Sequence, residues 1–153
     1  LPPHPATPDP LWSRGLGDVY KRQALAMTLD FVKQRKAFGQ RILDFQNTKF
    51  KLAECKTEAL IGRTFVDQCL IKHLDGNLDS STASMAKYWC TDKQNQIIDV
   101  CLQMHGGAGV SQDFPLASMY AHMRTLRLAD GPDEVHRRSI ARLELAKLMQ
   151  EDK

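Results

Sequence analysis

The spacing of apolar and small residues from Phe45 to about Leu74 constrains the fold more than any other feature of the chain. Steps of three and four alternate along this segment, through Phe45, Thr48, Leu52, Cys55, Ala59, Gly62, Val66 and Cys69. These steps match the 3.6 residues per turn of an α-helix, so one stripe of the helix forms a seam for a neighbouring helix. The sequence therefore predicts a long helix over 45–74 that packs against another helix.

Four further segments carry helical periodicity, and glycines, prolines or polar turns separate them. Leu25, Leu29 and Val32 recur at helical steps until Gly39 stops the pattern. The four predicted helices cover residues 24–38, 81–105, 115–127 and 133–149. No strand of convincing length and no internal repeat is visible. The predicted fold class is all-α, an antiparallel four-helix bundle.

Residues 1–23 differ in composition from the rest of the chain. Five of the first ten residues are proline, and Gly15 and Gly17 follow. Proline fixes φ and lacks a backbone donor, so this stretch is expected to be extended and disordered. We interpret residues 1–23 as a leader that was added to or wrongly joined with the domain, residues 24–150 as the helical domain, and residues 151–153 as a tail.

Charge and cysteine usage argue against several classes of protein. The chain has 21 basic and 18 acidic residues, a net charge of +3, and no dense run of Lys or Arg that would indicate nucleic-acid binding. No apolar run approaches the roughly 20 residues of a membrane-spanning helix. The cysteines lie inside predicted helices without a Cys-x-x-Cys pair, at Cys55, Cys69, Cys90 and Cys101. This pattern predicts reduced thiols in or near the core of an intracellular protein.

The end of the first predicted helix carries a basic and aromatic motif, Arg35-Lys-Ala-Phe-Gly-Gln40, followed by Phe45-Gln46. A guanidinium binds a phosphate through two parallel hydrogen bonds and keeps its charge at every working pH. At a helix C-terminus, Arg35 could equally be a surface cation that offsets the helix dipole. Both interpretations of Arg35 stand on the pattern alone.

A glycine-rich segment, Gln103-Met-His-Gly-Gly107, stands where the helix over 81–105 ends. Adjacent glycines allow a backbone or a ligand to approach closely because no Cβ is in the way. A helix C-cap explains Gly106 but not the whole run through Gly109. The segment is therefore a candidate for contact with a ligand.

An acidic segment, Leu128-Ala-Asp-Gly-Pro-Asp-Glu-Val-His-Arg137, precedes and opens the last predicted helix. A purely structural account takes Asp130 as the helix N-cap and Pro132 as an early helix residue. Asp133 and Glu134 then suit the positive end of the helix dipole. This account needs no function.

In this order and spacing, the three segments resemble the C-terminal helical domain of the acyl-CoA dehydrogenase family, over about residues 24–149. The sequence Ala-Asp-Gly-Pro-Asp-Glu, residues 129–134, is similar to that of long-chain-type members. The resemblance implies FAD as cofactor, an acyl-CoA thioester as substrate and an electron-transfer flavoprotein as electron acceptor. It also implies a homo-oligomer, a dimer or a tetramer.

The resemblance further implies cofactor roles for particular residues. The family's arginine at the position of Arg35 contacts the FAD pyrophosphate of the adjacent subunit. The family's Gln-x-x-Gly-Gly segment receives the adenosine part of that same neighbouring FAD. The other positions that match cofactor contacts are Phe38, Gln46, Gln103, Gly106, Gly107, Asp133 and Glu134.

Asp130 is the catalytic candidate that the resemblance implies. Many members carry Glu-Gly-Thr at this position, and the glutamate removes the α-proton of the substrate. Asp130-Gly131-Pro132 takes its place here, and an aspartate is one methylene shorter. Other relatives place the glutamate upstream, just before the helix that starts here near Ala24, where residues 1–23 offer no matching glutamate.

The function that the resemblance implies is α,β-dehydrogenation of acyl-CoA thioesters by a flavoprotein. Members of the family also have an N-terminal helical domain and a middle β-domain, so we expect a truncated domain that is inactive alone. The alternatives are a non-catalytic helical interaction module and part of a related flavin oxidase or monooxygenase.

The sequence predicts no metal site. A di-iron helical bundle needs two Glu-x-x-His motifs, and none is present. Bacterial cytoplasm, mitochondrion and peroxisome all fit the sequence.

Overall fold

The computed structural model describes residues 16–151, and the side chains of residues 20–150. The predicted leader over residues 1–23 lies mostly outside the described residues. In the described part, the elements in chain order are α1 (Leu16–Gln34), β1 (Lys36–Ala37), β2 (Gln40–Arg41), the 3-10 turn η1 (Ile42–Asp44), α2 (Gln46–Leu74), α3 (Ser80–His105), α4 (Gly107–Val110), α5 (Leu116–Leu126) and α6 (Asp133–Glu151).

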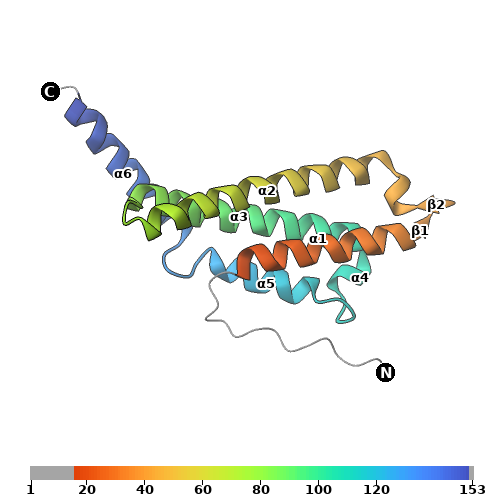
Figure 1. The fold of residues 1–153 in the computed structure, drawn as a ribbon. Coiled ribbons are helices and arrows are strands. Elements are labelled where there is room, and N and C mark those ends of the chain that lie inside the picture. The colour runs from red at the N-terminus through yellow and green to blue at the C-terminus, as the bar shows by residue number, and fades with distance from the viewer. Residues whose placement is uncertain (1–15, 152–153) are drawn as a thin grey trace.

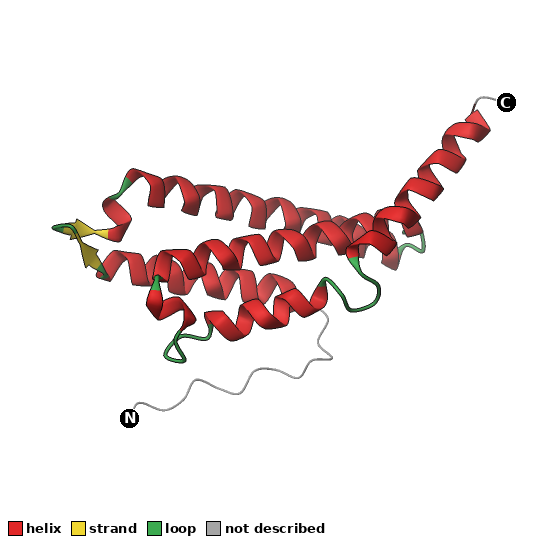
Figure 2. Cartoon of the chain, turned by 180° about the vertical axis from the view of Figure 1, so that it is seen from behind, coloured by secondary structure: helices red, strands yellow, loops and turns green. Residues whose placement is uncertain are grey.

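Four of these helices form an antiparallel bundle, in which α1, α2, α3 and α5 lie along one another (Figure 1). The central helix is α3, because it packs against α1, α2, α5 and α6. Seen from behind, α6 leaves the bundle at an angle, and the β1–β2 hairpin lies at the opposite end (Figure 2). The predicted all-α antiparallel bundle is therefore confirmed.

The seam of α2 follows the spacing that the sequence predicted. Five of its predicted seam residues are buried, namely Thr48, Cys55, Ala59, Gly62 and Cys69. Small side chains dominate this list, so α3 approaches α2 closely, and the Sγ of Cys90 on α3 lies 4.0 Å from the carbonyl oxygen of Gly62. The opposite face of α2 leaves large apolar side chains in solvent, including Leu60 and Leu74.

The first helix begins at Leu16, eight residues before the start at Ala24 that the sequence predicted. The extra turns belong to the domain because Tyr20 packs against the core cluster and Lys21 is only 5% exposed. Ala24 is fully buried and continues the same face. All the prolines of residues 1–23 lie within the first ten positions. Proline content therefore gave no reason to exclude residues 16–23 from the domain.

The core lies between α3 and its neighbours. Its buried members come from four helices: Ala24, Cys55, Ala59, Ile97, Ile98, Cys101, Leu116, Met119 and Met123. All four cysteines are free thiols, three of them buried and one half-buried, as predicted. Burial raises the pKa of Cys101 to about 11, which makes this thiol an unreactive packing residue.

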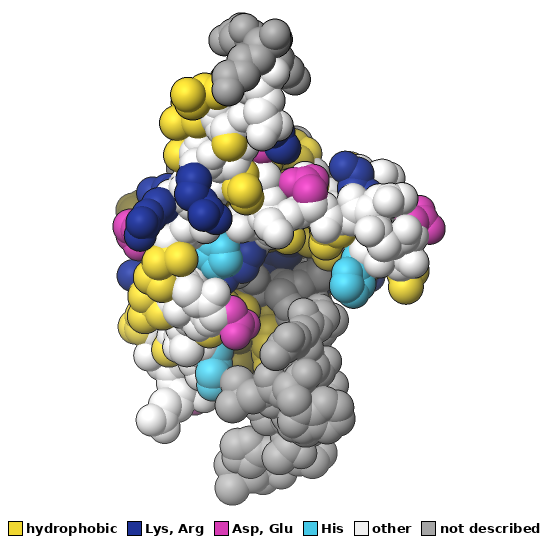
Figure 3. Space-filling model, turned by 90° about the vertical axis from the view of Figure 1, so that its left-hand side faces the viewer, with side chains coloured by type: hydrophobic (Ala, Val, Ile, Leu, Met, Phe, Trp, Pro, Cys, Tyr) yellow, Lys and Arg dark blue, Asp and Glu magenta, His cyan; other side chains and the backbone are white. Residues whose placement is uncertain are grey.

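The last helix projects beyond the bundle and carries an apolar stripe into solvent. Val135, Leu145, Leu148 and Met149 are all more than half exposed. The end of the molecule from which α6 rises has hydrophobic patches among basic side chains (Figure 3). None of the helices within residues 16–151 has the length and apolar character needed to cross a bilayer.

Candidate cofactor and catalytic site

The residues singled out in the sequence divide between the two ends of the bundle. The β1–β2 hairpin and α4 lie at one end, and the segment that opens α6 lies at the other (Figure 1). Lys87 on α3 contacts Gly131 in that segment, and Gly106, the C-cap of the same helix, follows Lys87 by 19 positions. At about 1.5 Å per residue, the two groups lie roughly 28 Å apart along α3. We call them the hairpin end and the α6 end.

The hairpin end presents Arg35 and Phe38 to solvent. Arg35 follows α1, where its backbone N–H donates to the carbonyl of Phe31 and its carbonyl accepts from the N–H of Ile42, both at 2.8 Å. Its guanidinium is exposed and pairs with none of the described residues. The backbone of Arg35 is thus fixed at the base of the hairpin, while its charge is available to a ligand.

Phe38 occupies the tip of the hairpin in an unfavourable state. Its ring is 94% exposed, and its φ of 52° lies in the left-handed region, next to Gly39 at 80°. Two successive positive φ angles are typical of the type I′ turn that joins two strands of a tight hairpin. A bulky residue in that region and an apolar ring in water both cost free energy. Contact of the ring with a molecule outside this chain would offset these costs.

The glycines after α3 differ in what they do. Gly106 caps α3 with a φ of 57°, as the C-cap interpretation required. A Cβ on Gly109 would lie 2.7 Å from the carbonyl oxygen of Leu102, so this glycine is needed for packing. A Cβ on Gly107 would meet nothing within 4 Å. Gly107 therefore has no packing requirement in this chain, and Gln103 beside it is exposed.

His105, which lies inside the glycine-rich segment, joins the two segments at the hairpin end. It is 4% exposed, and its ring stacks on Phe31 of α1 with centroids 4.2 Å apart and packs edge-on against Phe114. Its Nδ1 lies 2.8 Å from the carbonyl of Cys101 and therefore carries the proton, because a carbonyl only accepts. His105 thus holds the end of α1, which bears Arg35, against the end of α3.

The α6 end carries Asp130 in an exposed loop with a left-handed φ of 55°, followed by Gly131 at 104°. The helix itself begins at Asp133, and the carbonyl of Pro132 accepts from the N–H groups of Val135 and His136 at 3.0 and 3.4 Å. No described N–H donates to the Asp130 carboxylate. The interpretation of Asp130 as the N-cap is therefore wrong, because Pro132 separates it from the helix.

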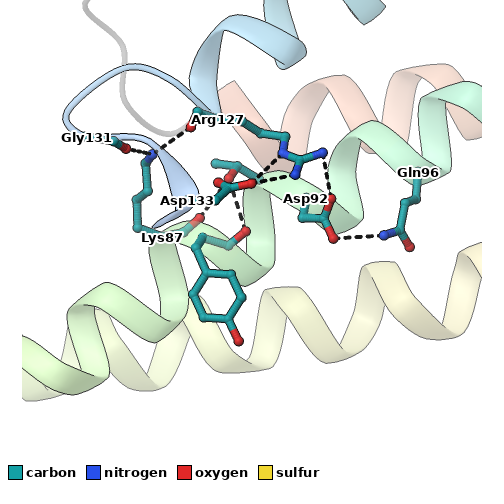
Figure 4. Close-up of polar contacts among 8 residues, drawn as sticks. Lys87, Asp92, Gln96, Arg127, Gly131 and Asp133 are labelled. Atoms are coloured by element: carbon teal, nitrogen blue, oxygen red, sulfur yellow. Dashed lines mark hydrogen bonds and ion pairs between the residues drawn. The ribbon is translucent and has the colours of Figure 1, made fainter. Parts of the chain in front are cut away.

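A network of charged side chains fixes the loop that carries Asp130 (Figure 4). The Nζ of Lys87 donates to the carbonyls of Arg127 and Gly131 at 3.4 and 2.5 Å. The guanidinium of Arg127 pairs with Asp92 at 2.8 Å and donates to Asp133 through two nitrogens at 2.8 and 2.5 Å. Hydrogen bonding to Asp133 raises the pKa of Arg127, and burial lowers the pKa of Lys87.

The same network gives the neighbouring acids Asp133 and Glu134 different surroundings. Asp133 is 4% exposed, and its Oδ2 is occupied by Arg127, whereas its Oδ1 is buried without a partner among the described residues. Glu134 is exposed. Asp133 thus has a structural role in this chain, and a cofactor role for either residue stays a prediction. No sequence motif marks Lys87 or Arg127, because their partners lie up to 44 residues away.

Asp130 lines neither of two hollows on the described surface. One of about 290 Å³ is lined by Ile61, Phe65, Met85, Tyr88 and Trp89, between α2 and α3. Another, of about 250 Å³, lies between α3 and α5 and includes Arg127 but not Asp130. In residues 16–151, no three His, Cys, Asp or Glu side chains come together as metal ligands. The described candidates are thus an exposed carboxylate at Asp130 and an exposed guanidinium at Arg35.

Comparison with known proteins matches these features to one family. The chain matches the family model of the acyl-CoA dehydrogenase C-terminal domain over residues 17–145. It is 44% identical over 115 residues to the mitochondrial long-chain specific acyl-CoA dehydrogenase of Mus musculus, covering 75% of this chain and 27% of that protein. It is 40% identical over 124 residues to acyl-CoA dehydrogenase family member 11 of Gallus gallus, covering 80% of this chain and 16% of that protein.

A solved structure shows the same fold. The acyl-CoA dehydrogenase from Geobacillus kaustophilus superimposes with a TM-score of 0.80 at 34% identity, covering 83% of this chain and 33% of that one. The chain thus spans about a quarter of the mouse relative and a third of the bacterial one. From the family model, the identities and the fold together, the chain belongs to the acyl-CoA dehydrogenase family and corresponds to its C-terminal helical domain.

Proposed function

We propose that this chain is the C-terminal part of an FAD-dependent enzyme that dehydrogenates acyl-CoA thioesters between Cα and Cβ, with Asp130 as the base. One observation carries the proposal: Asp130 is exposed in a left-handed conformation and has no hydrogen-bond partner among the described residues, while the half-buried Lys87 holds its loop. A carboxylate without a structural task, on a fixed loop, is suited to removing a proton from a bound substrate.

The hairpin end fits the chemistry of FAD. The free guanidinium of Arg35 suits a pyrophosphate, and the exposed ring of Phe38 suits a flat aromatic group. Gln46, Gln103, Gly106 and Gly107 would line the approach of the adenosine part, and the open space at Gly107 supports this. FAD, when bound, supplies the redox chemistry by accepting the hydride. The residues of this chain bind and orient it.

The two ends serve two different cofactor molecules in this proposal. They lie roughly 28 Å apart along α3, so Arg35 and Asp130 do not act on the same reacting group. Arg35 and Phe38 would bind the FAD of a second subunit, and Asp130 would face the flavin of its own subunit. The active enzyme is then at least a homodimer, and an electron-transfer flavoprotein takes the electrons from the reduced cofactor.

The proton step depends on the loop rather than on the side-chain length of Asp130. A general base must lie about 2.6–3.2 Å from the group that gives up the proton, or act through one water. Aspartate is shorter than the glutamate of many family members, so the backbone at Asp130 has to bring the carboxylate towards the substrate. Glu134 lies four residues later, in the first turn of α6, and is exposed, where it would meet the cofactor or the substrate.

The proposal is tested by joining this chain to the N-terminal and middle domains of an acyl-CoA dehydrogenase relative, here called the joined protein. Asp130→Asn is compared with the unchanged joined protein for bound flavin and for bleaching of the flavin by a panel of acyl-CoAs. Asp75→Asn, an exposed acid at the end of α2, is the matched control. We expect Asp130→Asn to keep its flavin and to lose bleaching, while Asp75→Asn keeps both.

Two other outcomes would count against the proposal in different ways. Equal bleaching by Asp130→Asn and the unchanged joined protein would place the base elsewhere. Failure of every variant to hold flavin would remove the cofactor roles of Arg35, Gln46 and Gly106, and would favour a purely structural helical module. Oxygen consumption by the reduced flavin would indicate an oxidase or monooxygenase instead.

A further inference from the structure

We propose that Lys87 is a positioning residue, whose ammonium group on α3 holds the Asp130 loop in the geometry that proton removal requires. The inference rests on the proposed function, because it concerns the carboxylate that serves there as the base. Lys87 itself touches neither substrate nor cofactor in this proposal. It acts through the backbone of the loop.

Lys87 fixes the loop at both of its ends. Its Nζ donates to the carbonyl of Arg127, where α5 ends, and to the carbonyl of Gly131, directly after Asp130. These are the contacts drawn in Figure 4, and they join α3 to a segment 40 and 44 residues later in the chain. Because one ammonium group binds both ends of residues 127–131, the segment between them has little freedom to shift.

The opposite side of the loop is closed by α6. A Cβ on Gly131 would lie 3.3 Å from Nε2 of His136 and 3.7 Å from Cγ1 of Val135, so the loop already contacts that helix closely. Asp130 and Gly131 both have positive φ, a backbone state that is rarely favoured without support from its surroundings. The loop is thus held between Lys87 on one side and α6 on the other.

The charge of Lys87 is used differently from that of Arg127. Arg127 forms ion pairs with Asp92 and Asp133, so carboxylates match its charge. No described carboxylate lies within ion-pair distance of Lys87. Its ammonium group donates to two backbone carbonyls instead. Asp133 and Asp130 are near enough for their charges to act on Lys87 and oppose the effect of burial on its pKa. A half-buried ammonium is costly unless its donors are satisfied, and the two loop carbonyls accept from two of its three N–H groups.

The first test measures amide hydrogen exchange in the full 153-residue chain. The N–H groups of Leu128 and Ala129 donate to the carbonyl of Thr125 at 2.9 and 3.0 Å, so their protection reports on the loop. We expect Lys87→Met, which removes both hydrogen bonds to the loop, to speed their exchange by at least about tenfold, and Lys87→Arg to restore most of the protection. Exchange at Ile97 and Ile98, in the core of α3, should stay unchanged.

A matched control separates positioning from general destabilisation. Lys93 is also a half-buried lysine of α3, and it pairs with Glu58 on α2 at 3.0 Å, away from the loop. Lys93→Met should leave exchange at Leu128 and Ala129 unchanged. If Lys87→Met does not fold, Lys87→Gln replaces it. Unchanged loop exchange in the Lys87 variant, or an equal rise throughout the chain, would overturn the proposal.

The second test uses the joined protein. It compares the rate of flavin bleaching with flavin content and KM, because a merely structural role would not change the rate alone. Lys87→Met should slow bleaching of the flavin about tenfold without changing flavin content or KM for the acyl-CoA, and Lys87→Arg should recover the rate. If Asp130→Asn bleaches normally, the proposed function fails, whereas the exchange data still decide whether Lys87 anchors the loop. A rise in KM with an unchanged rate would also contradict positioning of the base.

Discussion

The hairpin end and the α6 end are built by opposite means. At the hairpin end, Arg35 and Phe38 are exposed, and the backbone hydrogen bonds of the hairpin join residues close by in the sequence. At the α6 end, Lys87 and Arg127 reach across the fold, and Asp133 is buried. The difference teaches that one end leaves Arg35 and Phe38 in solvent, while the other end uses its charged groups internally to hold the loop of Asp130. The predictions below test this contrast, beginning with the largest effect.

Loss of Arg127 should damage the fold most. Arg127→Leu leaves the Asp133 carboxylate, 5% exposed, without its ion-pair partner, and removal of one member of a buried pair costs about 3 kcal/mol. Urea unfolding should show this loss. Arg41→Leu breaks an exposed pair with Asp44 at the hairpin end and should barely change the unfolding midpoint. Equal effects of the two substitutions would remove the contrast between the ends.

The two glycines after α3 should respond oppositely to alanine. Gly109→Ala brings a Cβ to 2.7 Å from a backbone oxygen and should cost about 2 kcal/mol in thermal unfolding. Gly107→Ala meets open space and should change stability by less than about 0.5 kcal/mol. In the joined protein, Gly107→Ala should nevertheless weaken flavin retention. Full retention of flavin by Gly107→Ala would show that no ligand approaches there.

Phe38 should matter for binding and not for folding. Phe38→Gly removes an exposed ring and suits the left-handed backbone, so thermal stability should stay level or rise. The joined protein should retain flavin about tenfold less tightly, as loss of one aromatic contact implies. Equilibrium dialysis of the flavin measures this change. A drop in the thermal midpoint would instead give Phe38 a role in the fold itself.

Acid should loosen the start of α3 by a small amount. Asp79 caps α3, and its hydrogen bonds to Thr82 lower its pKa to about 2, from an ordinary value of 3.8. Since the folded pKa lies below the unfolded one, the stabilisation is complete above about pH 4 and is lost as the pH falls to about 2. Asp79→Asn retains a capping side chain that does not titrate. Its urea midpoint should therefore fall less over this range than that of the unchanged chain.

The helices were predictable from the sequence because their signals are local. The seam of α2 and the turn before α3 gave boundaries within a residue of those observed, since periodicity and capping act over a few positions. The start of α1 was missed because its evidence is burial of Tyr20 and Lys21 against other helices. Composition alone could not reveal that burial.

The candidate site was predictable only in part, for a related reason. Arg35, Phe38 and Gly107 stand in short motifs whose exposure agrees with the proposed role. Lys87 and Arg127 belong to no motif, because their partners are chosen by the packing of α3 against α5 and α6. The N-cap interpretation of Asp130 failed because α6 begins at Asp133. Pro132, and not Asp130, is the residue directly before the helix, and its carbonyl accepts the first hydrogen bonds.

The central position of α3 has a consequence for the synthesis of the chain. Because α3 packs against α1, α2, α5 and α6, a nascent chain that has released only α1 to α3 lacks the partners that cover one side of its central helix. Leu116, Met119 and Met123 of α5 complete the core only when they leave the ribosomal tunnel. Nascent chains that end before residue 116 should accordingly be digested rapidly by protease, while those that expose α5 should resist. The order of translation thus leaves one apolar side of α3 uncovered until α5 arrives.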